Sequence, residues 1–167
     1  MTNQIHNKNI ETETVITSPI ELRQQISVSE QGKENILSSR NTVEDIFLGN
    51  DDRLIVIVGP CSIHDINAAK EYALKLLALQ KEVEKSIFIV MRVYFEKPRT
   101  TVGWKGLISD PDMDNSLDVE KGLRQGRELL AWLAEKNIPT GTEALNPITP
   151  QASEQTTLSE VNKLFVV

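Results

Sequence analysis

Basic and hydroxyl side chains gather in one short stretch of the sequence, directly after the apolar run 87–91. Guanidinium and ammonium groups bind carboxylates and phosphates through charge-assisted hydrogen bonds. The unit Lys97-Pro98-Arg99-Thr100 combines a point charge, a residue with a fixed φ, a bidentate fork and a neutral donor. This combination favours phosphate binding over a merely solvated loop. The whole stretch contains Arg92, Lys97, Arg99, Lys105, Thr100 and Thr101.

Arg92 and Glu143 are charged residues on segments that otherwise have the pattern of β-strands. Alternation places Arg92 on the same face as Val90 and Tyr94, where a guanidinium needs a carboxylate or phosphate partner. Glu143 lies at the end of a later strand. We interpret it either as that partner or as a carboxylate that positions a water.

Cys61 is the single cysteine of the sequence and follows a strand that ends in Gly59-Pro60. A free thiol has a pKa of about 8.5 and ionises more readily beside a cation or a metal. The alternative is that Cys61 is only a small buried hydrophobic residue. His64 is either a second ligand or proton carrier, or a capping or surface residue. A single cysteine excludes an intrachain disulfide and fits a reducing compartment.

Hydrophobic periodicity and capping residues predict the elements that position these groups. An apolar run at 54–58 is expected to form a parallel strand covered on both faces, and the long loop 107–116 to be functional, with Trp104 holding it down. The predicted helices begin at Ser18, cover Ser29–Leu48, run from Asp65 or Asn67 to Val83, and run from Asp118 to Glu135. The predicted strands cover Leu54–Val58, Ile87–Tyr94 and Ile138–Leu145.

The order β-α-β-α-β after two N-terminal helices implies right-handed crossovers and a parallel sheet. In such sheets, and in (β/α)-barrels, the chemistry gathers at the carboxyl ends of the strands. Three segments occupy that position, namely 59–64, 92–101 and 143–146. We therefore expect them to converge in space.

The overall charge limits the class of ligand. A net charge of −6 over 167 residues argues against general affinity for nucleic acid or for anionic membranes. The basic stretch is a local exception, which indicates a small anionic ligand. No apolar run is long enough to span a bilayer, and the polar start lacks the apolar region of a secretory signal. We expect a cytoplasmic protein.

Three motifs resemble one enzyme family. The segments Val58-Gly-Pro-Cys-Ser-Ile-His-Asp65, Met91 to Pro111 and Thr142-Glu-Ala-Leu145 are similar to the class I 3-deoxy-D-arabino-heptulosonate 7-phosphate (DAHP) synthases. The resemblance runs from about residue 50 to 151 and more weakly through the N-terminal helices. It implies a metal-dependent (β/α)8 barrel enzyme that condenses phosphoenolpyruvate with erythrose 4-phosphate and releases phosphate. This reaction is the first step toward chorismate and the aromatic amino acids.

The resemblance also implies roles for individual residues. Cys61 matches a metal ligand, Arg92 a residue that binds phosphoenolpyruvate, and Glu143 a catalytic carboxylate. Lys97 matches a catalytic residue between the two substrates. The erythrose phosphate is expected on Lys97, Pro98, Arg99 and Thr100. Family members are commonly inhibited by Phe, Tyr or Trp and form oligomers, and the candidate inhibitor-site residues are Asn146, Pro147, Pro150 and Gln151, together with the N-terminal arm.

The sequence departs from the family pattern after Gln151. A complete barrel typically needs about 250 residues. We therefore expect an α/β fold that forms the N-terminal part of a barrel. Its segments are a flexible N-terminus (1–17), a helical arm (18–49), the first β/α units (53–151) and a tail outside the family pattern (152–167).

The expected partial barrel lacks the His, Glu and Asp metal ligands that the family takes from later strands. We therefore expect the chain alone to be inactive. The alternative is an inactive remnant or an interaction module that pairs with a full-length subunit. A related synthase that uses another aldose is a further alternative. The Lys97-Pro98-Arg99-Thr100 unit argues against it.

Overall fold

The computed structural model describes residues 15–99, 102–143 and 151. The helices are α1 (Pro19–Gln25), α2 (Glu30–Leu48), α3 (Ile66–Val83) and α4 (Val119–Glu135). The strands are β1 (Leu54–Val58), β2 (Ile87–Arg92) and β3 (Thr140–Gly141). This order confirms the predicted β-α-β-α-β succession after two N-terminal helices. The tail 152–167 and residues 1–14 lie outside the described residues.

The strands form a parallel sheet in the order β1-β2-β3. Two strands are shorter than predicted. β2 ends at Arg92. Beyond it, one hydrogen bond from the Val93 amide to the Gly141 carbonyl oxygen continues the pairing with β3. β3 pairs over two residues only, while Ala144 and Leu145 lie outside the described residues. The register places Leu54 beside Ile87, Val58 beside Met91, and Met91 beside Thr140.

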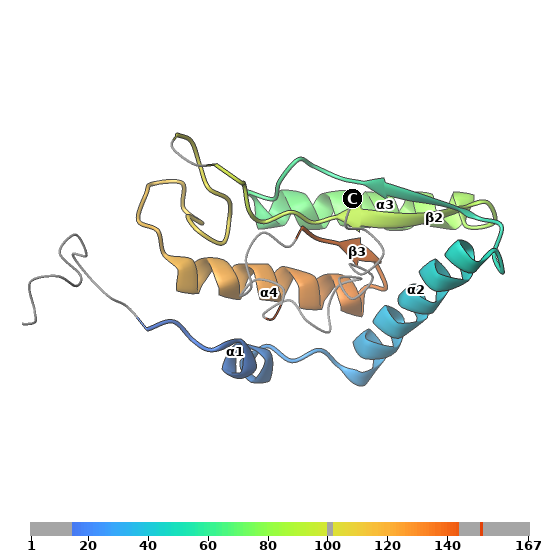
Figure 1. Cartoon of the computed structure of the whole chain (residues 1–167), viewed down its shortest axis with the longest axis horizontal. Helices are drawn as coiled ribbons and strands as arrows, with labels where there is room; N and C mark the ends of the chain where they lie inside the picture. Colours follow the sequence, from blue (N-terminus) through green and yellow to red (C-terminus); the bar gives the residue numbers. More distant parts are fainter. Residues whose placement is uncertain (1–14, 100–101, 144–150, 152–167) are drawn as a thin grey trace, which may run out of the picture.

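Helices cover β2 on both faces (Figure 1). Ile89, Met91 and Val93 face the main core, which α3 and α4 complete. Phe88 and Val90 pack instead against Val43 of α2. This is the alternation that the sequence predicted. Because α2 leads into the amino end of β1, it lies at the opposite end of the sheet from the loops that follow β1 and β2 (Figure 1).

The helices begin and end at residues that the sequence marks. Ser18 and Glu21 form a reciprocal capping box at α1. The carboxylate of Asp65 accepts from the amides of Asn67 and Ala68, so Asp65 is the cap of α3. Gly49 ends α2 with φ at 76°, a left-handed conformation that glycine adopts at little cost. Ser29 and Asp118 cap α2 and α4.

Two expectations about burial are wrong. β1 is not covered on both faces, because Leu54 is 64% exposed and Ile57 is 54% exposed. Within the described residues β1 is an edge strand, with a neighbour on one side only. The sequence also predicts a loose apolar face on α2 formed by Ile36, Val43, Ile46 and Phe47. Phe47 does not join this face and is 49% exposed. Ile36 and Ile46 of the same helix are partly buried against the smaller clusters, as expected.

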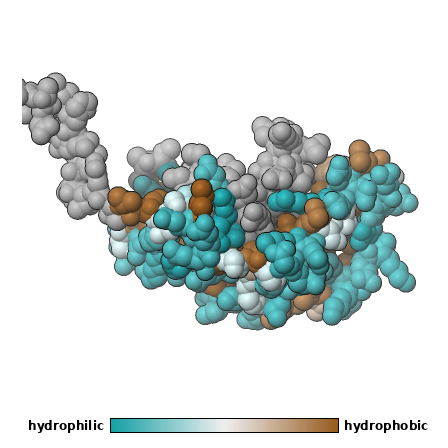
Figure 2. Space-filling view, turned by 90° about the horizontal axis from the view of Figure 1, so that it is seen from below, coloured by the Kyte–Doolittle hydropathy of each residue, from teal (hydrophilic) through white to brown (hydrophobic). Residues whose placement is uncertain are grey.

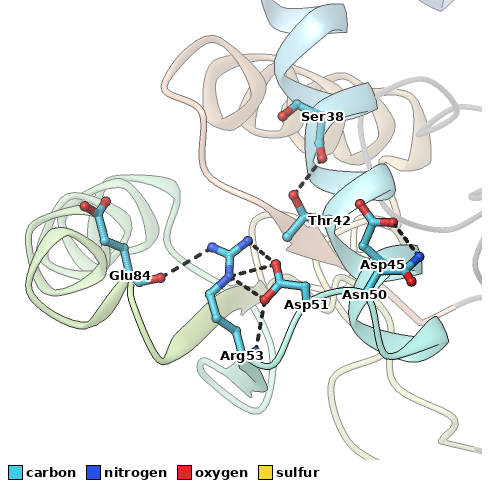
Figure 3. Close-up of polar contacts among 7 residues, drawn as sticks. All are labelled: Ser38, Thr42, Asp45, Asn50, Asp51, Arg53 and Glu84. Atoms are coloured by element: carbon cyan, nitrogen blue, oxygen red, sulfur yellow. Dashed lines mark hydrogen bonds and ion pairs between the residues drawn. The ribbon is translucent and has the colours of Figure 1, made fainter.

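Arg53 fixes the entry of the chain into β1 (Figure 3). Its guanidinium donates to the Asp51 carboxylate, with 2.6 Å from Nη2 to Oδ2, and its Nη1 lies 3.4 Å from the Glu84 carbonyl oxygen. It also lies 5.5 Å above the ring centroid of Phe88. One side chain therefore joins the start of β1 to the end of α3 and to β2. Figure 3 also shows the hydrogen bond from the side chain of Asn50, which follows α2, to the carboxylate of Asp45 in the last turn of that helix.

The underside of the molecule in Figure 2 is hydrophilic over most of its area, with small separate hydrophobic areas. None of the helices in the described residues is long and apolar enough to cross a membrane.

Candidate functional site

The loop after β1 and the loop after β2 meet at the carboxyl end of the sheet. The Lys97 ammonium donates to both the sulfur and the carbonyl oxygen of Cys61, at 2.8 Å each. Nη2 of Arg92 lies 3.4 Å from the same carbonyl oxygen. Two of the three predicted segments therefore converge. We call Cys61, Arg92 and Lys97 the strand-end cluster.

Cys61 is an exposed thiol and not a buried hydrophobic residue. The hydrogen bond and the charge of Lys97, and the charges of Arg92 and Arg99, lower the pKa of the Cys61 thiol. A nearby cation stabilises the thiolate relative to the neutral thiol. The cluster thus pairs a thiol that ionises readily with several cations.

Arg92 makes different contacts from those predicted. No ion pair joins it to Glu143, which is half-buried. The guanidinium instead lies 4.1 Å from the centroid of the Tyr94 ring. Its Nε is buried and has no hydrogen-bond partner among the described residues. Arg92 therefore keeps one buried donor whose hydrogen bond is not satisfied within the described residues.

An isolated antiparallel β-bridge holds the backbone of Lys97 in place. Glu96 and Gly106 form a bridge, and the Lys97 amide donates to the Lys105 carbonyl oxygen at 3.0 Å. Gly106 has φ at 108°, and a Cβ there would lie 2.2 Å from the Phe95 carbonyl oxygen. Only glycine fits this close approach. The basic loop is thus tied at its base, which leaves its tip exposed at Pro98 and Arg99.

Trp104 anchors the following loop, as the sequence predicted. Its indole Nε1 donates to the Asp110 carbonyl oxygen at 2.6 Å. Asp110 itself is only 3% exposed, and its Oδ2 accepts from the Asn115 amide at 3.3 Å. Beside these residues lies a hollow of about 510 Å³. It is lined by Gly103, Trp104, Lys105, Asp110, Met113, Asn115 and Leu117.

The described residues supply one of the expected metal ligands. Cys61 has the donor chemistry of a transition-metal ligand. Within 15–99, 102–143 and 151, however, no group of three His, Cys, Asp or Glu residues lies in a ligating arrangement. His64 is an exposed surface residue. A catalytic zinc site, for comparison, normally has three protein ligands, so the described part does not hold a complete metal centre.

Comparisons with known proteins assign the family. The sequence profile described as the DAHP synthetase I family matches residues 20–159. The chain belongs to the DAHP synthetase I family. The match extends beyond Gln151, where the sequence patterns place the end of the resemblance.

Relatives in this family are about half identical to the chain. The Tyr-sensitive phospho-2-dehydro-3-deoxyheptonate aldolase of Escherichia coli K12 is 51% identical over 147 residues, which cover 88% of this chain and 41% of the relative. The aldolase of Amycolatopsis methanolica is 50% identical over 136 residues, covering 81% of this chain and 67% of the relative. The chain therefore spans about 41% of the length of the Escherichia coli relative.

The structure of the Francisella tularensis SCHU S4 aldolase has the same fold over the shared part. Its TM-score to this chain is 0.85 at 50% identity, and the match covers 89% of this chain and 44% of that one. Other relatives in the DAHP synthetase I family are named Phe-sensitive and Trp-sensitive.

Several residues expected to act in a DAHP synthetase I protein lie outside the described part, namely Thr100, Asn146, Pro147 and Pro150. Gln151 is described and exposed. Its carbonyl oxygen accepts from Nη1 of Arg23 in α1 at 2.8 Å. The contact joins the N-terminal arm to one residue of the expected inhibitor site.

Sequence reasoning missed the residues that hold the arm against α4. Glu120 accepts from the amide and the hydroxyl of Thr17. Glu135 likewise accepts from the amide and hydroxyl of Ser29, at 2.8 and 2.7 Å. Arg127 Nε donates to the Ile26 carbonyl oxygen at 3.1 Å. These partners are about a hundred residues apart in the sequence, so no local pattern indicates them.

Proposed function

We propose that the chain forms the first β/α units of a (β/α)8 barrel that condenses phosphoenolpyruvate with erythrose 4-phosphate to DAHP and phosphate. The observation that carries this proposal is the strand-end cluster in a member of the DAHP synthetase I family. Its cations lie where parallel strands present their carboxyl ends, the place where (β/α) enzymes bind substrates.

Within this proposal each residue of the cluster has a distinct task. Arg92 binds the phosphoenolpyruvate anion through the N–H donors of its guanidinium. Pro98, Arg99 and Thr100 take the phosphate of the erythrose. Lys97 stands beside Cys61, between these two anions, where its charge offsets their repulsion. Glu143 supplies a carboxylate at the end of β3.

The metal requirement is part of the proposal. A divalent metal supplies a Lewis acid that polarises the aldehyde. Cys61 is the residue of this chain that would hold it, joined by ligands from further strands of the barrel. Because the described residues include no group of three side chains that could hold a metal ion, we expect the 167-residue chain alone to consume no phosphoenolpyruvate.

A chimeric enzyme tests the proposal. Residues 20–151 of this chain replace the matching part of the Escherichia coli Tyr-sensitive relative, and consumption of phosphoenolpyruvate is followed with and without erythrose 4-phosphate and a divalent metal. We expect activity that needs both additions. Arg92→Ala or Lys97→Ala should lower kcat/KM at least a hundredfold, about 2.7 kcal/mol. The control Lys85→Ala, an exposed lysine between α3 and β2, should leave it unchanged.

Two results of that assay contradict the proposal. Full activity of the chimera after Arg92→Ala would remove the assigned role of the cluster. Metal-dependent activity of the unaltered 167-residue chain would show that no further barrel strands are required.

A second candidate is an interaction module that pairs with a full-length subunit. It is favoured by the exposed edge residues of β1. Co-purification of the tagged chain with that relative tests this candidate. Failure to associate at micromolar concentrations would eliminate it.

Inhibition by Phe, Tyr or Trp, an oligomeric assembly and a cytoplasmic location also belong to the proposal. The Arg23 contact with Gln151 supports an inhibitor site that includes the N-terminal arm. The chimera provides the test, because Arg23→Ala should weaken inhibition by the effective amino acid without changing uninhibited turnover.

A further inference from the structure

Tyr94 is the nearest aromatic partner of Arg92. Arg92 is the last residue of β2 and Tyr94 follows two residues later, with the guanidinium carbon 4.1 Å from the ring centroid. This contact is shorter than those of Arg53 with the Phe88 ring and of Lys70 and Lys136 with the Trp132 ring, which measure 5.5 to 5.9 Å. Tyr94 is half-buried, so part of its surface is withdrawn from water.

The backbone of Tyr94 is fixed as well. Its carbonyl oxygen accepts from the Ile63 amide at 2.8 Å. Ile63 is only 2% exposed and belongs to the loop that carries Cys61. Tyr94 therefore joins the loop after β1 to the segment after β2, and this hydrogen bond holds the backbone that carries its ring.

A ring beneath a guanidinium restrains its plane without using its N–H donors. A carboxylate partner such as Glu143 would do the opposite, since it would accept from those donors and compete with a ligand. The observed geometry matches the first case. Arg92 forms no ion pair with Glu143, and its Nη2 lies 3.4 Å from the Cys61 carbonyl oxygen. Its buried Nε has no partner within the part of the chain that the structure describes.

We infer that Tyr94 is a positioning residue for Arg92, which orients the guanidinium so that its edge donors receive the phosphate or carboxylate of a small anion. The inference rests on the proposed function for the identity of that anion, but not for the role of the ring. The aromatic face carries the effect, and the hydroxyl is not needed.

Three variants of the 167-residue chain test the inference. Tyr94→Phe keeps the ring, Tyr94→Leu removes it, and Tyr94→Ile removes it with a β-branched side chain that suits extended backbone. The anions are phosphoenolpyruvate and inorganic phosphate, and their affinities are measured by titration calorimetry. The Nε–H signal of Arg92 is followed by NMR at the same time, because ring current from Tyr94 shifts it.

We expect Tyr94→Phe to match the unaltered chain in both measurements. The Leu and Ile variants should bind each anion about five-fold more weakly, and the Arg92 Nε–H signal should move toward the position of a free arginine. Thermal unfolding of each variant establishes that it is folded, and either aliphatic variant suffices.

The outcomes separate the two proposals. Equal anion affinity in the Leu or Ile variant and the unaltered chain overturns the role of Tyr94 and leaves the proposed function standing. Ring-dependent binding of phosphate without binding of phosphoenolpyruvate supports Tyr94 and contradicts the proposed substrate. Binding of neither anion to the unaltered chain overturns the role of Tyr94, while the proposed function is decided by the chimera.

Discussion

At the scale of single residues, the contact between Cys61 and Lys97 is the feature with the clearest chemical consequence. Lys97 is the main cause of the lowered pKa of the Cys61 thiol. Its replacement by Gln should raise that pKa toward the ordinary value, so the thiolate fraction at neutral pH should fall. Alkylation by iodoacetamide measured against pH reports this directly, because Cys61 is the single cysteine.

Lys105→Gln is the matched control for this measurement. Lys105 belongs to the same basic loop but is not among the groups that lower the Cys61 pKa. The control should leave the alkylation profile in place. An equal shift in both variants would mean that the general charge of the loop, and not the hydrogen bond from Lys97, activates the thiol.

Glu135 gives a second residue-scale prediction, this time for stability. The hydrogen bonds from Ser29 lower the pKa of Glu135, so the carboxylate contributes stability above its ordinary pKa, about 4.3. That contribution is lost as the pH falls through the lower folded-state value. Glu135→Gln should therefore lower the free energy of unfolding at pH 7. It should also make the decrease of that free energy between pH 7 and pH 3 less steep, as measured by urea unfolding at each pH. The exposed carboxylate Glu82, on α3, provides the control Glu82→Gln, whose acid-induced loss should remain as steep as in the unaltered chain.

At the scale of elements, two glycines of α4 allow a matched test of packing. A Cβ at Gly122 would lie 2.2 Å from the Ile108 carbonyl oxygen, and the backbone there has no room to yield. A Cβ at Gly126 would lie 3.7 Å from the Phe95 ring, an ordinary contact. Gly122→Ala should cost about 2–3 kcal/mol. Gly126→Ala should add about 0.5–1 kcal/mol through helix propensity.

Chemical denaturation of the two variants measures this difference. Equal stability would mean that the loop 107–110 moves freely away from α4, which contradicts the anchoring of that loop by Trp104.

The cap of α2 has a smaller effect that belongs to the same scale. Ser29 accepts from the Gly32 amide and also donates to Glu135. Ser29→Ala should destabilise the chain by about 1 kcal/mol. Ser38→Ala, on the exposed face of the same helix, should change stability by less than about 0.5 kcal/mol. A similar loss in both variants would contradict a specific role of the Ser29 cap, because helix propensity favours alanine over serine and cannot itself cause the loss.

Sequence patterns predicted the elements well because caps and periodicity are local. The Ser18 box, the Gly49 stop and the β2 alternation all depend on neighbouring residues. The approach of Lys97 to Cys61 followed from the rule that parallel strands share one carboxyl end. The partner of Arg92 was not predictable in the same way, because Tyr94 and Glu143 offered two competing contacts and only the geometry distinguishes them.

At the scale of the whole molecule, the edge of the sheet governs solution behaviour. Leu54 and Ile57 of β1 are exposed, and an unpaired edge strand with apolar residues promotes association. We expect concentration-dependent self-association of the 167-residue chain in sedimentation velocity. Ile57→Thr should reduce it. Val102→Thr, at an exposed position in the basic loop, is the control and should not. Monomeric behaviour of the unaltered chain at high concentration would contradict this expectation.

The two carboxylates that hold the N-terminal arm stand fifteen residues apart on α4, at Glu120 and Glu135. At 1.5 Å per residue their separation along the axis is about 22 Å. One inserted residue would turn the second carboxylate by about 100° relative to the first. The spacing of Glu120 and Glu135 on α4 therefore sets the distance that the chain from Thr17 to Ser29 must span. The length of α4 is constrained by these contacts with the N-terminal arm as well as by packing against the sheet. Changes in length are expected to be absorbed by the exposed residues 112–117 that precede the helix, and not by α4.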